Sequence, residues 1–256
     1  MAAPLEQFEQ GYRQLYTTES FRYDRARFSD SEGRLFDQDE RAMIWRLLRA
    51  QPGQRVLDVA AGTGRIAAYL AERGLDVVAC DLTTNMLRQA RSRTDGRPHE
   101  LACVGGNGRM LPFGDELFDT VISIRFLHLF PVSFHHAFVQ EMWRVLRPGG
   151  TLLIQFDSAL GGGGLALARE LYRRLVRRHK PRYYLWPRQV PQVFAPIEAT
   201  SLHGFSPFCG RFVRQIHAPS ADRLEALLDE GPPSFLANYL FVRAVKPPAQ
   251  LDGEPA

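Results

Sequence analysis

One stretch constrains the fold of this chain more than any other. In residues 55–67, RVLDVAAGTGRIA, an apolar run leads into two glycines and then into helix-forming sequence. The apolar run favours a strand, whereas Gly62 and Gly64 allow a tight turn with positive φ and leave the backbone open to a ligand. A helix that begins at about Gly64 directs unpaired N–H groups and its positive dipole end toward the turn. The stretch therefore predicts a site for an anionic or carboxylate-bearing cofactor, typically a nucleotide.

The residues after this turn complete a strand–helix–strand unit. The helix ends near Gly74, and residues 76–80 form a second apolar strand that stops at Asp81. Such a unit is right-handed and its two strands are parallel. An acid at the end of the second strand is placed to accept hydrogen bonds from both hydroxyls of a ribose. The alternative is that Asp81, Thr83 or Thr84 only caps the next helix.

Strands and helices continue to alternate through the rest of the chain. Helices are predicted at residues 85–93, 133–146 and 222–229, and strands at 101–104, 118–124, 151–156, 199–205 and 237–245. The third strand runs into Gly105, Gly106, Asn107 and Gly108, an open backbone at the carboxyl end of a strand, where ligands bind in such sheets. The alternation predicts an α/β fold with a doubly wound, Rossmann-like parallel sheet.

The chain is long enough for one such domain with a lid or a small subdomain. We expect a single domain over residues 1–246, followed by a disordered tail at 247–256 that is rich in Pro, Gly and acids. Within it, residues 1–50 are a helical leader or lid, 51–158 the cofactor-binding core, 159–231 a basic helix, an irregular cap and the sixth strand, and 235–246 the last strand. The leader carries spaced aromatic residues and is expected to form short helices. It either packs on the sheet edge or closes over the active site.

Basic residues are concentrated in one segment. Residues 169–182 hold seven Arg and Lys against one acid, which makes this segment +6 in a chain whose net charge is +4. Helical spacing places Arg173, Arg174, Arg177 and Arg178 on one face of a helix that follows the glycines of 161–164. This face is either solvated or meets an acidic substrate or an anionic membrane surface.

Other features of the sequence argue against several classes of protein. The first residues, MAAPLEQFEQ, are too acidic for a signal peptide, and no apolar run reaches the roughly 20 residues that span a bilayer, so a cytoplasmic protein is expected. Cys80, Cys103 and Cys209 lack any metal-ligand spacing, and no metal site is predicted. No motif of the DNA base methylating kind follows the fourth strand, and no nucleic-acid partner is expected.

Several blocks of sequence together resemble a known family. They are VLDVAAGTG at 56–64, Asp81 followed by NML at 85–87, MLPFGDELFDTVIS at 110–123 and EMWRVLRPGGTLLI at 141–154. With these blocks in this order, the chain is similar to class I S-adenosylmethionine-dependent methyltransferases of the small-molecule type, close to the group that includes the quinone-ring methyltransferases. The resemblance implies a seven-stranded sheet, S-adenosyl-L-methionine as cofactor, and direct methyl transfer to a small-molecule acceptor.

The resemblance also implies which residues hold the cofactor. The glycine turn meets the methionine part, Asp81 binds the ribose and Leu82 packs on the adenine. Asn107 stands where the family usually has an Asp that bonds the adenine amino group. Its side-chain oxygen can accept the same bond, and we expect the change to weaken cofactor binding by ~1 kcal/mol. The full predicted set is Asp58, Ala60, Gly62, Gly64, Asp81, Leu82, Met86, Gly106, Asn107, Gly108 and Arg125.

Two other functions are compatible with part of this pattern. Gly62, Gly64 and Ala67 also satisfy GxGxxA, so an NAD-dependent oxidoreductase would explain the turn and Asp81. An oxidoreductase assignment would not account for the blocks at 110–123 and 141–154. The other alternative is a non-catalytic binding protein with the methyltransferase fold.

The sequence offers two candidates for a catalytic base. A base is needed only if the acceptor is a hydroxyl or an activated carbon, and histidine is the usual choice. His128, just past the fourth strand, is the first candidate and His203, on the sixth strand, the second. A structural role for His128 is the alternative. The acceptor is expected to be a small aromatic, lipid-like or glycan-type molecule.

Overall fold

A single seven-stranded sheet organises the molecule, in the order β3-β2-β1-β4-β5-β7-β6. The structure, a computed structural model, describes residues 5–99, 101–159, 182–197, 201–205 and 237–248. β1 to β5 are mutually parallel and β7 is antiparallel to both of its neighbours, so the predicted parallel sheet is in fact mixed. The strands are β1 Arg55–Val59, β2 Asp76–Asp81, β3 Ala102–Gly105, β4 Phe118–Ser123, β5 Leu146–Asp157, β6 Ser201–Phe205 and β7 Tyr239–Val245.

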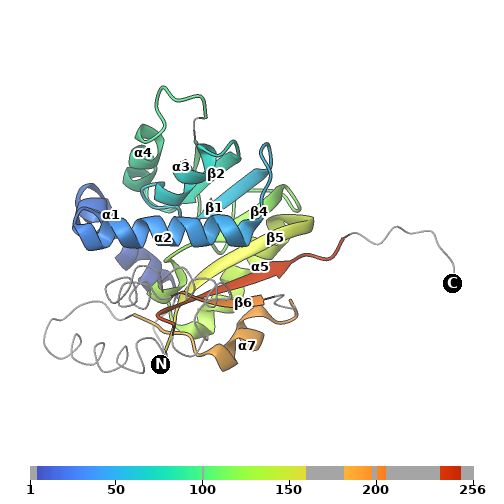
Figure 1. Ribbon diagram of the computed structural model, residues 1–256. Coiled ribbons are helices and arrows are strands. Elements are labelled where there is room, and N and C mark those ends of the chain that lie inside the picture. Colours follow the sequence, from blue (N-terminus) through green and yellow to red (C-terminus); the bar gives the residue numbers. More distant parts are fainter. Residues whose placement is uncertain (1–4, 100, 160–181, 198–200, 206–236, 249–256) are drawn as a thin grey trace, which may run out of the picture.

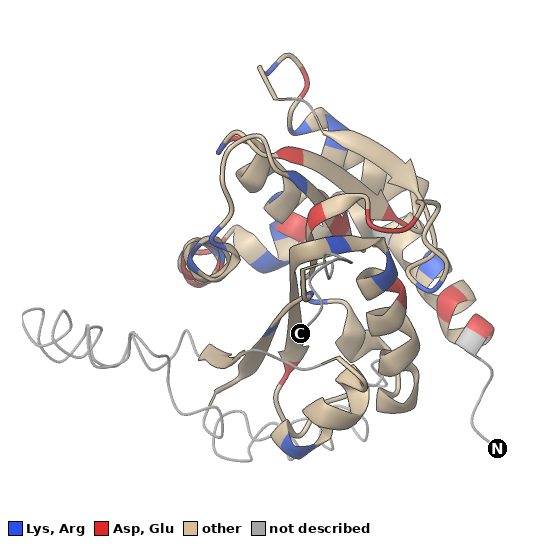
Figure 2. Cartoon of the chain, turned by 90° about the vertical axis from the view of Figure 1, so that its right-hand side faces the viewer, with Lys and Arg blue, Asp and Glu red and all other residues tan. Residues whose placement is uncertain are grey.

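Helices cover both faces of this sheet (Figure 1). Among the described residues the α-helices are α1 Leu5–Phe28, α2 Ser31–Leu48, α3 Arg65–Ala71, α4 Thr84–Ser92, α5 His135–Val145 and α7 Val190–Phe194. Short 3-10 turns, η1 Leu127–Leu129, η2 Val132–Phe134 and η3 Pro187–Gln189, connect some of them. In Figure 2, α2 is seen end-on beside the sheet, and the helices carry most of the coloured charges while the strands are mainly tan. The three-layer α/β architecture predicted from the alternation is therefore confirmed.

The core divides into two apolar clusters, one on each face of the sheet. Side chains of α2, α3 and α4 pack on one face with Val56, Val77 and Ile122, and α5 and α7 pack on the other with Leu57 and Val121. Neighbouring residues of β1 and β4 thus enter opposite clusters, as the two-residue period of a strand requires. Burial on both faces explains why these strands read as continuous apolar runs.

Three boundaries differ from the predictions. The leader forms two long helices, of 24 and 18 residues, instead of short ones. β5 begins at Leu146, before the Pro-Gly-Gly that was predicted to precede it, because the strand pairs through an irregularity in register between Phe118 and Thr120 of β4. The predicted irregular cap contains the five-residue helix α7, which tolerates Pro191 because proline in the first turn removes no helical hydrogen bond.

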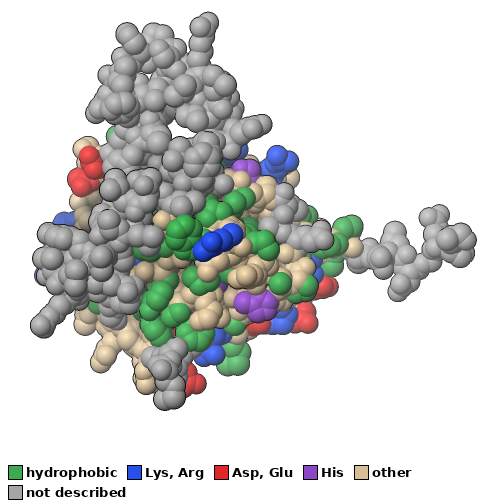
Figure 3. All heavy atoms as spheres, turned by 90° about the horizontal axis from the view of Figure 1, so that it is seen from below, with side chains coloured by type: hydrophobic (Ala, Val, Ile, Leu, Met, Phe, Trp, Pro, Cys, Tyr) green, Lys and Arg blue, Asp and Glu red, His purple; other side chains and the backbone are tan. Residues whose placement is uncertain are grey.

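Part of the chain lies outside the described residues. This part includes the predicted glycine joint, the predicted basic helix with Arg173, Arg174, Arg177 and Arg178, the predicted helix at 222–229 and most of the predicted tail. Viewed from below, the described atoms show hydrophobic side chains gathered near the centre of this face (Figure 3). In the part of the chain that the structure describes, no helix is long and apolar enough to cross a membrane.

The glycine that begins α3 makes a close contact that can be tested. Gly64 has φ +72, and a Cβ atom there would lie 2.8 Å from the Cα of Ala90. We predict that Gly64→Ala lowers the free energy of unfolding by about 2–4 kcal/mol, since left-handed strain and overpacking add. Gly53→Ala is the matched control, because φ is +84 there but nothing lies within 4 Å, and it should cost only about 1 kcal/mol. Equal losses in denaturant unfolding of the two variants would contradict the packing argument.

Candidate functional site

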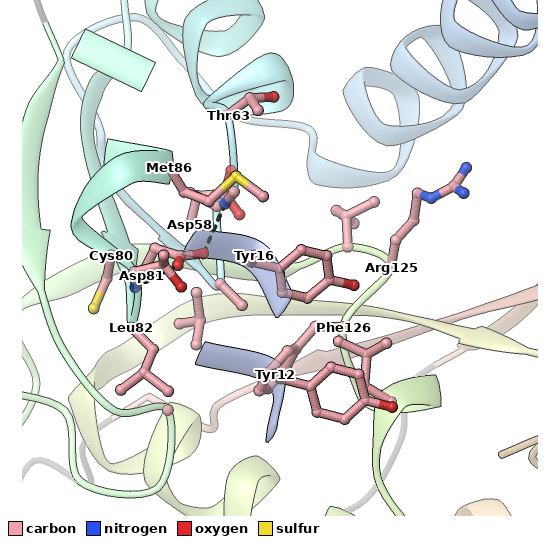
Figure 4. Close-up of a pocket in the computed structure, with 18 of the residues that line it drawn as sticks. Tyr12, Tyr16, Asp58, Thr63, Cys80, Asp81, Leu82, Met86, Arg125 and Phe126 are labelled. Carbon is pink, nitrogen blue, oxygen red and sulfur yellow. Dashed lines mark hydrogen bonds between the residues drawn. The ribbon is translucent and has the colours of Figure 1, made fainter. Parts of the chain in front are cut away.

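A large cavity opens at the carboxyl ends of the central strands. It lies where β1 and β4 are neighbours, the point at which the chain reverses its direction of travel across the sheet and ligands bind in such folds. The cavity holds about 1060 Å³ of empty space, part of it open to solvent. Its walls come from the turns after β1 to β4 and from α1, which lies across the opening (Figure 4).

The glycine turn and Asp81 are joined by hydrogen bonds. The backbone N–H of Gly62 donates to Oδ2 of Asp81 at 2.9 Å, and that of Thr83 donates to Oδ1 at 2.8 Å. Ala60 and Gly62 both have positive φ, 60° and 56°. A Cβ on Gly62 would meet nothing within 4 Å, so this backbone faces open cavity. The turn therefore offers a ligand an unobstructed backbone beside a fixed carboxylate.

Two carboxyl groups lie deep beside this turn. Burial raises the pKa of Asp81, and the two backbone donors oppose that shift. Burial likewise raises the pKa of Asp58 to about 8, with Arg65 lowering it and Asp81 raising it further. With a further hydrogen bond from the side chain of Thr83, three of the roughly four acceptor positions of the carboxylate are used, so Asp81 retains a position for a hydroxyl group of a ligand.

Most of the predicted binding residues meet in this cavity. Gly64 does not, since it begins α3 and packs on Ala90, and its predicted contact with a ligand is not supported. Figure 4 shows Asp81, Leu82 and Met86 on one side of the cavity and Arg125 on the other. The predicted residues that line it are Asp58, Ala60, Gly62, Asp81, Leu82, Met86, Gly106, Asn107, Gly108 and Arg125.

Asn107 is held by the leader helix. Its amide nitrogen donates to Glu9 at 3.1 Å, and its oxygen accepts the backbone N–H of Arg109 at 3.0 Å. Arg109 also pairs with Glu9 at 2.8 Å. The oxygen of Asn107 keeps one free acceptor position, while Glu9 brings a carboxylate to the same end of the cavity.

Aromatic side chains form the other walls. Tyr12 and Tyr16 of α1 are stacked with ring centroids 6.1 Å apart, and Tyr16 meets Tyr23 edge-on at 5.8 Å. Their spacing along the helix places all three on one face, and Figure 4 shows Tyr12 and Tyr16 reaching into the cavity. Rings of the turn after β4 and of α5 face them, and these rings are Phe126, Phe130 and Phe138.

Polar contacts fasten α1 over the cavity. Asp24 pairs with Arg93 and accepts a hydrogen bond from the hydroxyl of Thr63, in the glycine turn, at 2.9 Å. Asn85 donates to the backbone oxygen of Thr17 at 3.0 Å. With the Glu9 contacts, these bonds tie the leader to the loops after β1, β2 and β3. Of the two interpretations of the leader, its place on the cavity favours the lid.

A buried ion network supports the cavity from α2. Arg65 pairs with Asp37 and with the fully buried Glu40, and Gln155 donates to Glu40 at 2.7 Å. Arg65 lies at the start of α3 and also lines the cavity. Because Arg65 is the cation paired with the buried Glu40, removal of Arg65 would leave that carboxylate without its cationic partner.

Neither predicted catalytic histidine lines the cavity. His128 is buried, with Nδ1 3.8 Å from Oδ1 of Asp157, while its neighbours Phe126 and Leu129 face the cavity instead. His203 lies on β6, and its Nε2 is 2.8 Å from the hydroxyl of Ser201. The prediction that either is a general base therefore has no support from the geometry. The 3-10 turn η1 directs the side chain of His128 toward Asp157 of β5.

The sequence patterns did not predict the leader residues as individual site residues. Glu9, Tyr12, Tyr16 and Tyr23 all line the cavity, as does Arg65. A signal was present, because these acidic and aromatic residues recur at intervals that share one face of a single long helix. In the short helices that we predicted, these residues would not share one face.

Burial makes the charge of His128 sensitive to folding. Burial lowers the pKa of His128 from 6.5 to about 4, against the opposing effect of Asp157. Between these values the unfolded chain binds a proton that the folded chain does not, so we predict that stability falls by about 3 kcal/mol from this group as the pH drops through that window. Denaturant unfolding of His128→Gln should show a shallower pH dependence, whereas the exposed control His99→Gln should not. Equal slopes in all three proteins would contradict the assignment.

Comparisons with known proteins agree with this geometry. A family model described as a methyltransferase domain matches residues 57–154. A demethylmenaquinone methyltransferase from Beutenbergia cavernae is 45% identical over 117 residues, which cover 43% of this chain and 46% of the relative. An uncharacterised protein from Mycobacterium bovis is 39% identical over 139 residues, covering 54% and 50%. The chain thus spans about half the length of the curated relatives it matches.

Solved structures share the fold at low identity. A magnesium protoporphyrin IX methyltransferase from Synechocystis PCC 6803 with bound SAH has a TM-score of 0.68 and 15% identity, over 93% of this chain and 99% of the other. A [4+2]-cyclase has a TM-score of 0.65 and 18% identity, over 93% and 96%. The matched blocks, the seven-stranded sheet and the cavity agree. Residues 57–154 of this chain match a methyltransferase domain, and the seven-stranded sheet that contains them has the arrangement of that fold.

Proposed function

We propose that this chain is an S-adenosylmethionine-dependent methyltransferase that acts on a small, ring-bearing or lipid-like acceptor. One observation carries the proposal: the open glycine turn bonded to Asp81 and the aromatic walls from α1 belong to the same cavity. A polar end suited to a nucleoside and an apolar end suited to an acceptor are thereby side by side. The aromatic walls favour an apolar acceptor over a glycan.

The residues at the polar end fit the cofactor. Gly62 presents backbone with nothing in the space where a Cβ would lie, and the carboxylate of Asp81 retains an acceptor position for a ribose hydroxyl. Leu82 and Met86 supply apolar contacts for a base, and Asn107 with Glu9 supplies polar ones. When bound, S-adenosylmethionine supplies an activated methyl group on a sulfonium. The protein then has to align the acceptor with that methyl group and exclude water.

The leader provides that exclusion. α1 covers the cavity with Tyr12 and Tyr16 and is fastened at Glu9 and Asp24, so a bound acceptor lies beneath aromatic rings instead of open solvent. Several of the relatives are named demethylmenaquinone methyltransferase, and a flat ring of that kind suits walls made of tyrosine and phenylalanine. We therefore favour an aromatic acceptor among the classes considered from the sequence.

The alternatives remain testable. The [4+2]-cyclase has this fold at a similar TM-score, so the fold alone does not establish methyl transfer. An NAD-dependent oxidoreductase would use the same glycine turn and acid. Thermal shift separates the three functions, because a ligand that binds the folded chain raises its melting temperature. S-adenosylmethionine should raise it and NAD should not, and a non-catalytic protein that has lost the site responds to neither.

The role of Asp81 gives the first direct test. We predict that Asp81→Ala weakens S-adenosylmethionine binding by about tenfold or more, since hydrogen bonds from hydroxyls to a carboxylate contribute about 1.5–3 kcal/mol. Isothermal titration calorimetry measures this. The matched control is Asp95→Ala, which removes an exposed acid in the loop after α4 and should leave the affinity unchanged. Unchanged affinity in Asp81→Ala would overturn the cofactor assignment.

The lid role of α1 gives the second test. If α1 closes on the cofactor, hydrogen exchange of its backbone amides should slow when S-adenosylhomocysteine binds, because opening then requires loss of ligand contacts. The amides of β7 serve as the internal control, since that strand pairs with β5 and β6, lines no part of the cavity and should change little. Equal protection of α1 with and without ligand would mean that the leader is fixed packing and does not act as a lid.

A further inference from the structure

Arg125 stands out among the cavity residues because its guanidinium has no hydrogen-bonding partner among the described residues. Its side chain makes no hydrogen bond or ion pair with the part of the chain that the structure describes. Its guanidinium carbon lies 5.2 Å from the ring centre of Phe36 and 5.6 Å from that of Phe28. The neighbouring Arg65, by contrast, is paired with both acids of the α2 network. Cation–π contacts alone contribute about 1 kcal/mol and leave the N–H donors of Arg125 unused.

The acids near Arg125 are already occupied. Glu40 is bound by Arg65 and Gln155, and Asp157 accepts from Arg182 at 3.4 Å. Burial lowers the pKa of Arg125, but Glu40, Tyr239, Tyr23 and Asp157 together raise it by more, so the guanidinium stays charged. The result is a charged, fork-shaped donor that lines an aromatic cavity and forms no hydrogen bond with the described residues.

The backbone conformation of Arg125 is strained. Its φ is 59°, in the left-handed region, directly after β4. A non-glycine residue there is strained by about 1–3 kcal/mol, and such residues concentrate at binding sites. On the opposite wall, the hydroxyl groups of Tyr16 and Tyr23 also make no hydrogen bond among the described residues. Polar groups from α1 and from the end of β4 are thus available to one ligand atom.

Arg125 belongs to the acceptor end of the cavity. Figure 4 shows Tyr16 between Arg125 and Asp81, and the side chain of Arg125 extends away from Asp81. The cofactor role predicted for Arg125 from the sequence would need the opposite direction. A guanidinium matches a carboxylate or an ionised hydroxyl in shape as well as in charge.

We propose that Arg125 binds an acidic oxygen on the acceptor, so that the acceptor is a flat ring that carries an ionised hydroxyl or a carboxylate. This inference rests on the proposed function and specifies its acceptor. Arg125 stabilises the anionic form, and the proton of an acidic hydroxyl leaves to solvent. An acceptor bound as the anion is already deprotonated and can attack the methyl group directly. The reaction then needs no histidine base in the cavity wall.

Matched ring probes test the charge preference. The full chain is titrated with 2-naphthoate and with its neutral counterpart 2-naphthamide, with and without S-adenosylhomocysteine. We expect the anion to bind the wild type at least about tenfold more tightly, and Arg125→Gln to reduce that preference to about twofold or less. The control is Arg22→Gln, which changes an exposed arginine of α1 that does not line the cavity and should keep the preference. Equal binding of both probes, no binding of either, or a preference that survives in Arg125→Gln would overturn the inference.

A chromophoric phenol gives a readout that a purely structural role would not move. The absorbance of 4-nitrophenol reports its ionisation directly, and a tenfold preference for the anion lowers the pKa of the bound phenol by about one unit. The wild type and Arg125→Lys should lower this pKa, and Arg125→Gln should not. An unchanged or raised pKa in the wild type would contradict the proposal.

Calorimetry with S-adenosylmethionine on the same variants separates this inference from the proposed function. Arg125→Gln should bind the cofactor as the wild type does. If the wild type fails to bind the cofactor but keeps its preference for naphthoate, the proposed function fails and the anion site stands. If Arg125→Gln loses cofactor affinity and keeps the naphthoate preference, Arg125 serves the cofactor and the inference is wrong.

Discussion

The carboxylate of Asp81 is the constraint on which the site depends. It ends β2, is buried, and accepts backbone hydrogen bonds from Gly62, in the turn after β1, and from Thr83, before α4. These bonds fix the ends of two neighbouring parallel strands relative to each other. The left-handed φ values of Ala60 and Gly62 are maintained within this frame. A cavity floor made of backbone can stay open only where such bonds replace side-chain packing.

Covering that floor is the task of the leader. α1 contacts the turn after β1 through Asp24, the start of α4 through the bond from Asn85 to Thr17, and the loop after β3 through Glu9. Its tyrosines face the rings of the turn after β4, so α1 borders both the polar and the apolar part of the cavity. An acceptor and a nucleoside cofactor bound together would be enclosed by the same helix, which links binding of one to the environment of the other.

The sequence predicts the sheet and the polar end of the site well, for a physical reason. Strand, glycine turn and strand-end acid are encoded in short segments, and the parallel topology then brings Gly62, Asp81 and Asn107 to one edge. Predictions failed where the outcome depends on tertiary packing. The leader forms long helices because its residues are stabilised by the loops it covers, and local sequence does not contain that information.

The histidines show the same limit at a single residue. His128 follows β4 as an acid–base residue would, yet the turn of η1 directs it to Asp157, whereas Arg125, three residues earlier, lines the cavity. Position after a strand predicts proximity to the site, but side-chain direction within an irregular turn follows from φ and ψ, which sequence patterns do not fix. Gly64 is a further case, since its small size serves the contact with Ala90.

The central claim is that this cavity transfers a methyl group to a small molecule. It is tested most directly by incubating the full chain with methyl-labelled S-adenosylmethionine and an extract of small metabolites, followed by mass spectrometry of the labelled product. The account predicts one dominant product, with a methyl group in place of a hydrogen, on a ring that bears an acidic oxygen or a group derived from one. Binding of the cofactor without any labelled small molecule above that of the Asp81→Ala variant would contradict the account.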